Sequence, residues 1–286
     1  MTGLSLPSGA AAGYRPGRTL RLGVESVRQL RRRRTQLVLG FLVLLPFILL
    51  LAFELGSDSS GNRSGTLVDL ATTSGENFTI FALFASTGFL FVVIVALFFG
   101  DTVASEASWS SLRYLLAAPV PRARLLAQKA TVSALLSLLA LTVLPAVALG
   151  VGVLFYGPGD PLSPAGESMP FGTMLGRLAL AVVYLAVHLS WVAMLALLLS
   201  VSTDAPLGAV GGTVLLSILS QILDSITALG GLRDYLPTHY DYAWSDLLTS
   251  DITWAEMASG AFSAASYAAI FGLLAWRRFA TKDITS

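Results

Sequence analysis

Long apolar stretches separated by shorter polar ones dominate the chain. Six of them reach the length of about 20 residues that an α-helix needs to cross a bilayer. We expect these spans at about 35–55, 78–99, 130–155, 175–201, 207–229 and 257–276. The pattern predicts an all-α membrane protein with a six-helix transmembrane domain over residues 35–276.

Composition agrees with lipid as the solvent of this domain. The chain is 55% hydrophobic and only 12% charged, whereas soluble domains carry roughly 25% charged residues. There is no cysteine, which excludes a disulfide scaffold, a thiolate metal site and a cysteine nucleophile.

Lysine and arginine are concentrated on one side of the expected spans. Eight arginines precede the first span, four basic residues lie in or beside the loop between the second and third spans, and three follow the sixth. Fifteen of the eighteen basic residues therefore share one side. Because the positive side of a membrane protein faces the cytoplasm, we expect both termini to be cytoplasmic.

The N-terminal region divides into two parts. Residues 1–18 are rich in Gly, Ala, Pro and Ser and are predicted to be a disordered tail. Over residues 19–34, apolar positions recur at spacings of four and three between arginines, which predicts an amphipathic helix in the headgroup layer. These positions are Leu20, Val24, Val27 and Leu30. A plain basic anchor is the alternative. Nucleic-acid binding is disfavoured because the arginine run adjoins the membrane.

Few ionisable residues fall at membrane depth, where such groups are candidates for function. His188 lies near the middle of the fourth expected span, and Asp224 lies toward the outer end of the fifth. Either could serve transport, although His188 could equally hydrogen-bond a neighbouring helix. Gradient-driven transporters usually show more acidic residues at mid-membrane or broken helices. Their scarcity suggests that the energy for transport enters from elsewhere.

The acidic, aromatic loop 230–256 suggests short helices at the outer interface, with a ligand-binding rim as the alternative.

The sequence contains none of the common signatures of enzyme chemistry. There is no GxxxxGK[ST] phosphate loop, no HExxH and no GxSxG. We therefore expect no catalytic, cofactor or metal site in this chain, and no enzymatic activity of its own.

The polar loop 101–129 is the longest interruption on the basic side. Residues 102–117 lack Pro and Gly and carry an apolar face, so they predict a short helix. Pro119 and Pro121 end it, because proline lacks the amide donor and clashes with the preceding turn. The stretch from Arg122 to Lys129 then leads as a helix into the third span. A rigid helix here could transmit force from a partner, whereas a solvated connector is the plain alternative.

At these residues the sequence resembles the ABC-2 type transporter permeases, in particular the six-span permeases of the bacitracin-resistance type. That family carries the pattern E…GTLRYLL..P..R…L..K between its second and third spans. In this chain Ser110 and Ser111 stand where the family has Gly and Thr. The matching positions are Glu106, Ser111, Leu112, Arg113, Tyr114, Leu115, Leu116, Pro119, Arg122, Leu125 and Lys129. The basic tail 277–286, with its Lys282-Asp283 pair, is also similar to the family's usual ending.

The resemblance implies a bacterial inner-membrane exporter. Two permease copies, identical or related, would pair above two ATP-binding subunits, which would hold the ATP and Mg²⁺. The helix within 101–129 would be the coupling helix. Glu106 and Arg113 would make polar contacts with the ATPase, and Pro119 would set the turn. The packed face would consist of Tyr114, Leu115 and Leu116.

We therefore expect a permease that exports a lipid-like or amphipathic drug-like substrate, with membrane lipid and the ATP-binding subunit as partners and no nucleic acid. Two alternatives stay open. One is an ion-gradient-driven transporter or channel that uses His188 or Asp224. The other is a non-transporting membrane anchor that recruits a cytosolic partner through the same loop.

Overall fold

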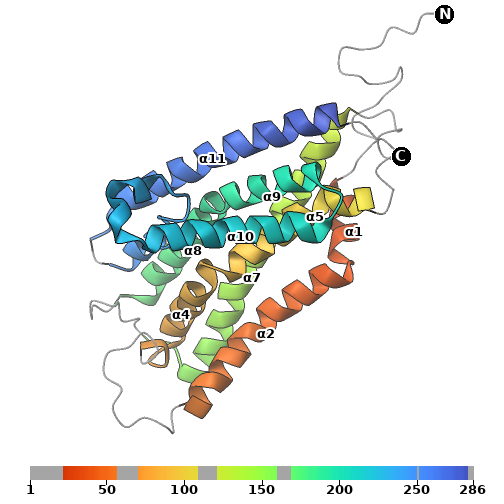
Figure 1. The fold of residues 1–286 in the computed structure, drawn as a ribbon. Coiled ribbons are helices and arrows are strands. Elements are labelled where there is room, and N and C mark those ends of the chain that lie inside the picture. Colours follow the sequence, from red (N-terminus) through yellow and green to blue (C-terminus); the bar gives the residue numbers. More distant parts are fainter. Residues whose placement is uncertain (1–21, 57–69, 109–120, 160–168, 250, 283–286) are drawn as a thin grey trace, which may run out of the picture.

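The fold of the protein was analysed in a computed structural model, which describes residues 22–56, 70–108, 121–159, 169–249 and 251–282 (Figure 1). Within these ranges the chain is helical and contains no β-strand. The elements are α1 (Leu22–Leu30), α2 (Arg33–Gly56), α4 (Gly75–Thr87), α5 (Leu90–Ser108), α7 (Arg122–Tyr156), α8 (Phe171–His188), α9 (Ser190–Ser202), α10 (Pro206–Ser225), the 3₁₀ helices η3 (Thr227–Tyr235) and η4 (Ala243–Leu248), and α11 (Trp254–Thr281).

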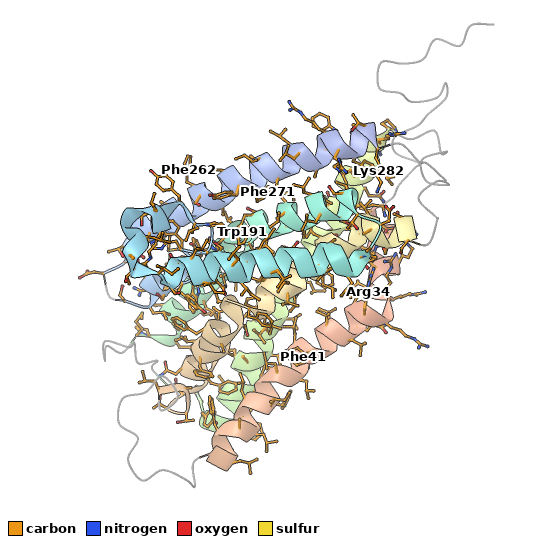
Figure 2. The ribbon with its side chains drawn as sticks, in the orientation of Figure 1. Arg34, Phe41, Trp191, Phe262, Phe271 and Lys282 are labelled. Atoms are coloured by element: carbon orange, nitrogen blue, oxygen red, sulfur yellow. The ribbon has the colours of Figure 1, made fainter. Side chains whose placement is uncertain are left out.

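Six segments of the described chain are long and apolar enough to cross a membrane, which confirms the expected number of spans. They are α2, α5, α7, α8 with α9, α10 and α11. Within the most apolar stretch of each helix, 72% of the residues of α5 are buried in the protein, whereas only 17% of those of α2 are. Thus α5 and α8–α9 form the centre of the bundle, and α2, α10 and α11 lie at its perimeter. Figure 2 shows Phe262 of α11 pointing away from the bundle, and this side chain is 78% exposed.

The second and fourth predicted spans are each made of two helices. The span expected at 78–99 is interrupted between α4 and α5 at Gly88 and Phe89, and the span expected at 175–201 is interrupted between α8 and α9 at Leu189. At Leu189 the backbone has φ −71° and ψ 0°, which departs from the α-helical ψ near −42°. The fourth span is still a single candidate membrane-spanning segment, Phe171–Ser202, whereas in the second only α5 is long and apolar enough to count as one.

The polar stretch after the second span also differs from the prediction. Residues 101–108, expected to open the polar loop 101–129, instead continue α5 as a mostly buried helix. The hydroxyl of Ser200 in α9 accepts hydrogen bonds from the backbone amides of Val103 and Ala104, at 3.1 and 3.0 Å. The polar residues after position 100 thus belong to the packed bundle. The expected helical lead from Arg122 into the third span is confirmed by α7.

Several helix ends also differ from the expected bounds. The amphipathic helix expected over 19–34 is represented by α1, which ends at Leu30 and is separated from α2 by two residues. The fifth span ends at Ser225 rather than 229, and α11 extends the sixth through Thr281 into the expected tail. The short helices expected within 230–256 are present as the end of η3 and as η4.

Close backbone contact joins α4 to α7 through two glycines. A Cβ atom added at Gly152 would lie 2.6 Å from the carbonyl oxygen of Gly75, and one added at Gly75 would lie 2.4 Å from the amide nitrogen of Val153. Small residues permit such close approach of membrane helices. Any side chain at either position would force the two helices apart.

Candidate functional site

A cluster of charged side chains joins α1, α5 and α7. It lies at the basic end of the bundle, which we define as the end that holds Arg34 and Lys282 (Figure 2). Lys129 Nζ of α7 lies 2.5 Å from Glu106 Oε1 of α5. Arg28 Nη2 of α1 lies 3.3 Å from the same oxygen and 2.7 Å from Glu25 Oε1. The Glu106 carboxylate therefore connects the N-terminal helix to two spans.

Glu25 supports this cluster from within α1. Its Oε1 also accepts a hydrogen bond from Gln29 Nε2 at 3.1 Å. Burial disfavours the ionised Glu25 carboxyl, but the hydrogen bond from Arg28 and the charges of Lys129 and Arg28 outweigh it. Together they hold the pKa of Glu25 below its ordinary value. Glu25 is thus ionised at neutral pH and keeps Arg28 directed toward α5.

A second acidic residue of α5 binds the arginines that precede and begin α2. Asp101 Oδ1 pairs with Arg34 Nη1, and Asp101 Oδ2 lies 3.5 Å from Arg32 Nη1. Asp101 is only 7% exposed. Because a buried charge is stable only when it is paired, these arginines are needed to keep Asp101 inside the bundle.

The beginning of α7 is bonded to the end of α11. Arg122 Nη1 donates to the carbonyl oxygens of Ala280 and Lys282, both at 3.0 Å. A basic side chain at these carbonyls also complements the negative end of the helix dipole. Lys282 Nζ in turn lies 2.9 Å from Asp204 Oδ1 in the connection between α9 and α10. The start of α7, the end of α11 and the connection between α9 and α10 are therefore bonded to one another at the basic end.

The residues predicted to contact an ATPase are only partly within the described chain. Glu106 is buried and bonded to Lys129 and Arg28, and Arg122 is bonded to the end of α11. Glu106 thus faces the interior of the protein, where the sequence led us to expect a contact with a partner. The remaining predicted residues lie outside the described ranges; they are Ser111, Leu112, Arg113, Tyr114, Leu115, Leu116 and Pro119.

A second polar network bridges the two interrupted spans. Gln221 Nε2 of α10 donates to the Gly88 carbonyl at 2.6 Å and lies 3.2 Å from Asp241 Oδ2. Asp241 Oδ1 lies 2.9 Å from His188 Nε2 at the end of α8. His188 and Asp241 are 1% and 5% exposed. One carboxylate therefore reaches both helix interruptions, directly at His188 and through Gln221 at Gly88.

Tyr184 fixes the same region from the other side of His188. Its hydroxyl donates to the carbonyl oxygen of Tyr240 at 2.7 Å, and its ring stacks on the His188 imidazole. A Cβ at Gly260 would lie 2.3 Å from the Tyr184 hydroxyl. The absence of a side chain at Gly260 is therefore required for α11 to pack here.

The two membrane candidates from the sequence do not share a network. His188 is bonded to Asp241, whereas Asp224 Oδ1 lies 2.6 Å from His239 Nδ1 and 3.5 Å from Arg233 Nε. Asp241 was not among the predicted site residues, because in the sequence it is one of several acidic residues in a loop. Among the described residues, no three His, Asp or Glu side chains gather in a way that could hold a metal ion.

The bundle of six apolar helices defines an all-α, multi-pass membrane protein. Residues 66–285 match the family described as "Protein of unknown function (DUF2705)", and the chain belongs to that family. The match takes in every element from α4 to α11 and begins after α2. No curated protein matches the chain.

Proposed function

We propose that this chain is the membrane-spanning permease subunit of an ATP-driven exporter of the ABC-2 type. In this proposal the basic end is cytoplasmic, two ATP-binding subunits dock there, and a second permease copy completes the transport path. The cargo is lipid-like or amphipathic, because the bundle offers apolar surface over most of its length. The resemblance of residues 106–129 to the coupling region of such permeases is the starting point.

The observation that supports this proposal best is how the stretch before α7 is anchored. It leaves α5 just after Glu106 and enters α7 at Arg122. Glu106 is bonded to Lys129 and Arg28, and Arg122 is bonded to the end of α11. A force applied between these two points would therefore reach α1, α5, α7 and α11 together, as coupling to an ATPase requires.

The same bonds refine the role of Glu106. A carboxylate buried against a lysine is a positioning group that holds α5 to α7, and the contact with the ATPase then falls to residues between Ser108 and Pro121. Arg113, Tyr114 and Leu115 are the members of the motif best suited to a protein contact, by charge and by apolar surface.

The test is purification of the tagged chain from its native host in a mild detergent, with identification of every co-purifying protein. We expect a stoichiometric subunit with a Walker A motif. The variant Arg113→Glu should release it, while Arg33→Glu, an exposed arginine at the start of α2, should retain it. A chain that purifies without any ATPase in the native sequence would refute the proposal.

A second candidate function is an ion-gradient-driven transporter. The observation in its favour is that two spans are interrupted beside the His188–Asp241 pair, since gradient-driven transporters often bind their ions at broken helices. It predicts flux in proteoliposomes that depends on a proton or sodium gradient and needs no second protein. Flux that collapses with an ionophore and survives without ATP would favour this candidate over the first.

A chain that binds a cytosolic partner through loop 101–129 and shows no flux under either condition would instead be a membrane anchor.

A further inference from the structure

A buried carboxyl group at the start of α4 has one oxygen that none of the described residues satisfies. Glu76 is 2% exposed. Its Oε2 accepts a long hydrogen bond of 3.4 Å from the Gly159 amide, and its Oε1 has no hydrogen-bond partner in the described part of the chain. A buried acceptor without a partner destabilises the folded protein, and more so when it is charged. Such a group is rarely retained in a membrane protein without a function.

The surroundings of Glu76 form a small cavity between α4, α7 and α8. Glu76 and Thr79 are its polar members, and its apolar members are Leu149, Phe171, Met174, Leu175 and Leu178. Phe171 and Leu175 are 43% and 46% exposed, whereas Met174 and Leu178 are buried. The cavity therefore begins at the outer surface of α8 and ends at the carboxyl group. Its enclosed part has room for about one water-sized group.

This arrangement selects the chemistry of a ligand. Glu76 Oε1 is an acceptor, and Thr79 Oγ1, which donates to the Gly75 carbonyl at 2.8 Å, keeps lone pairs that can accept. Glu76 lies in the first turn of α4, where the backbone amides of a helix N-terminus favour negative charge over positive charge. A cation with N–H donors would pair with it. A primary ammonium group meets these conditions and has the size of a water molecule.

We propose that Glu76 binds the primary ammonium group of an amphipathic molecule that enters the cavity from the membrane. The ammonium group lies between Glu76 and Thr79, and the attached hydrocarbon lies along Phe171 and Leu175 of α8. A quaternary ammonium group is excluded, because it has no N–H donor and is larger than the enclosed space. This assignment rests on the proposed function, for which it names the substrate class: molecules with an apolar body and a primary amine.

The experiment measures binding to the purified chain in a non-ionic detergent at neutral pH, with dodecylammonium and dodecyltrimethylammonium as probes. We expect saturable binding of the primary amine only. Glu76→Gln, which keeps the shape of the side chain, and Thr79→Val should each weaken it, the first by at least tenfold. Glu54→Gln removes an exposed carboxylate from α2 and should leave binding unchanged. Equal binding of both probes, or full binding by Glu76→Gln, would overturn the assignment.

Thr79→Val keeps the charge of the site, so it tests the second acceptor if Glu76→Gln should fail to fold. Competition with lysophospholipids then separates the sources of the amine. Displacement by lysophosphatidylethanolamine, but not by lysophosphatidylcholine, would point to aminophospholipid headgroups. Displacement by neither would point to a free amphipathic amine. Because no ATPase is needed in this measurement, its failure would leave the proposed partner intact, and absence of the partner would leave this site intact.

Discussion

Lys129 Nζ and Glu106 Oε1 lie 2.5 Å apart, and the two side chains are only 3% and 7% exposed. An ion pair this well excluded from water contributes little net stability compared with a packed apolar pair, since both ions lose their hydration. Removing one member of the pair destabilises the protein more strongly, because it leaves an incompletely compensated charge inside the bundle. The pair therefore fixes the relative position of α5 and α7 more than it adds to their stability.

This asymmetry gives the first prediction. Lys129→Met should lower stability by about 3–5 kcal/mol, because the buried Glu106 carboxylate would lose its 2.5 Å ion pair and the contact with Arg28 is longer, at 3.3 Å. The double variant Lys129→Met with Glu106→Gln should recover much of the loss. Thermal unfolding in detergent, followed by circular dichroism, would measure both. A double variant as unstable as the sum of the single variants would contradict a coupled pair.

The second prediction compares the two His–Asp pairs. His188→Leu should cost about 1–3 kcal/mol, because Asp241 would remain buried with Gln221 as its only side-chain partner among the described residues. His239→Leu serves as the matched control. The side chains of His239 and its partner Asp224 are each 24% exposed, so water can replace the lost bond. Similar losses in thermal stability for the two variants would contradict the buried role of Asp241.

The third prediction concerns the glycine contact between α4 and α7. Gly152→Ala should destabilise the protein by about 1–3 kcal/mol, because the new methyl group would meet the Gly75 carbonyl. Gly150→Ala, two residues away in the same helix, meets no atom within 4 Å. It should be neutral or slightly stabilising, since alanine favours the helix over glycine. Equal unfolding midpoints for both variants would show that the helices can separate at no cost.

The fourth prediction is a pH dependence of α1. The pKa of Glu25 is held below its ordinary value of 4.5 in the folded protein. A depressed carboxyl pKa stabilises the folded state above the ordinary pKa, and this contribution is lost as the pH falls through the lowered value. The docking of α1 on Glu106 should therefore weaken only at pH below about 4.5.

The chain has no cysteine, so a single spin label at Gly23→Cys would report this motion. A Cβ added at position 23 would meet no atom of the described residues within 4 Å. The label should become more mobile at acid pH in the otherwise native protein. With Glu25→Gln its mobility should be high throughout and independent of pH. A label whose mobility changes with pH equally in both proteins would assign the effect to another group.

The number and rough bounds of the spans could be predicted from the sequence, because apolar length alone decides whether a helix can cross a membrane. The interruptions could not. Leu189 is a good helix former, and Gly88 is a single glycine in an apolar run. Both positions are defined by distant partners, Gln221 for the Gly88 carbonyl and Asp241 for the neighbouring His188. Hydropathy carries no information about such pairings.

The burial of charged side chains was the second feature that could not be predicted from the sequence. Asp101 and Glu106 stand in the expected polar loop 101–129, where Glu106 was predicted to contact a partner, and Glu76 precedes the expected second span at 78–99. All three are buried. Asp101 and Glu106 are buried because arginines or a lysine from other elements reach them. The sequence indicated that Glu106 belongs to a functional segment, but it could not show that the carboxylate turns inward.

The bond between Arg122 and the end of α11 has a consequence for biosynthesis. Arg122 is made long before Ala280 and Lys282, the two residues whose carbonyls it binds. A growing chain can pair Glu106 with Lys129 as soon as α7 has been inserted, but it must wait for α11 before Arg122 finds its acceptors. The site proposed for the ATPase would therefore be completed only when the last helix is in place. A chain that stops before α11 would bind the ATP-binding subunits poorly, so complete permease chains would be favoured in assembly of the complex.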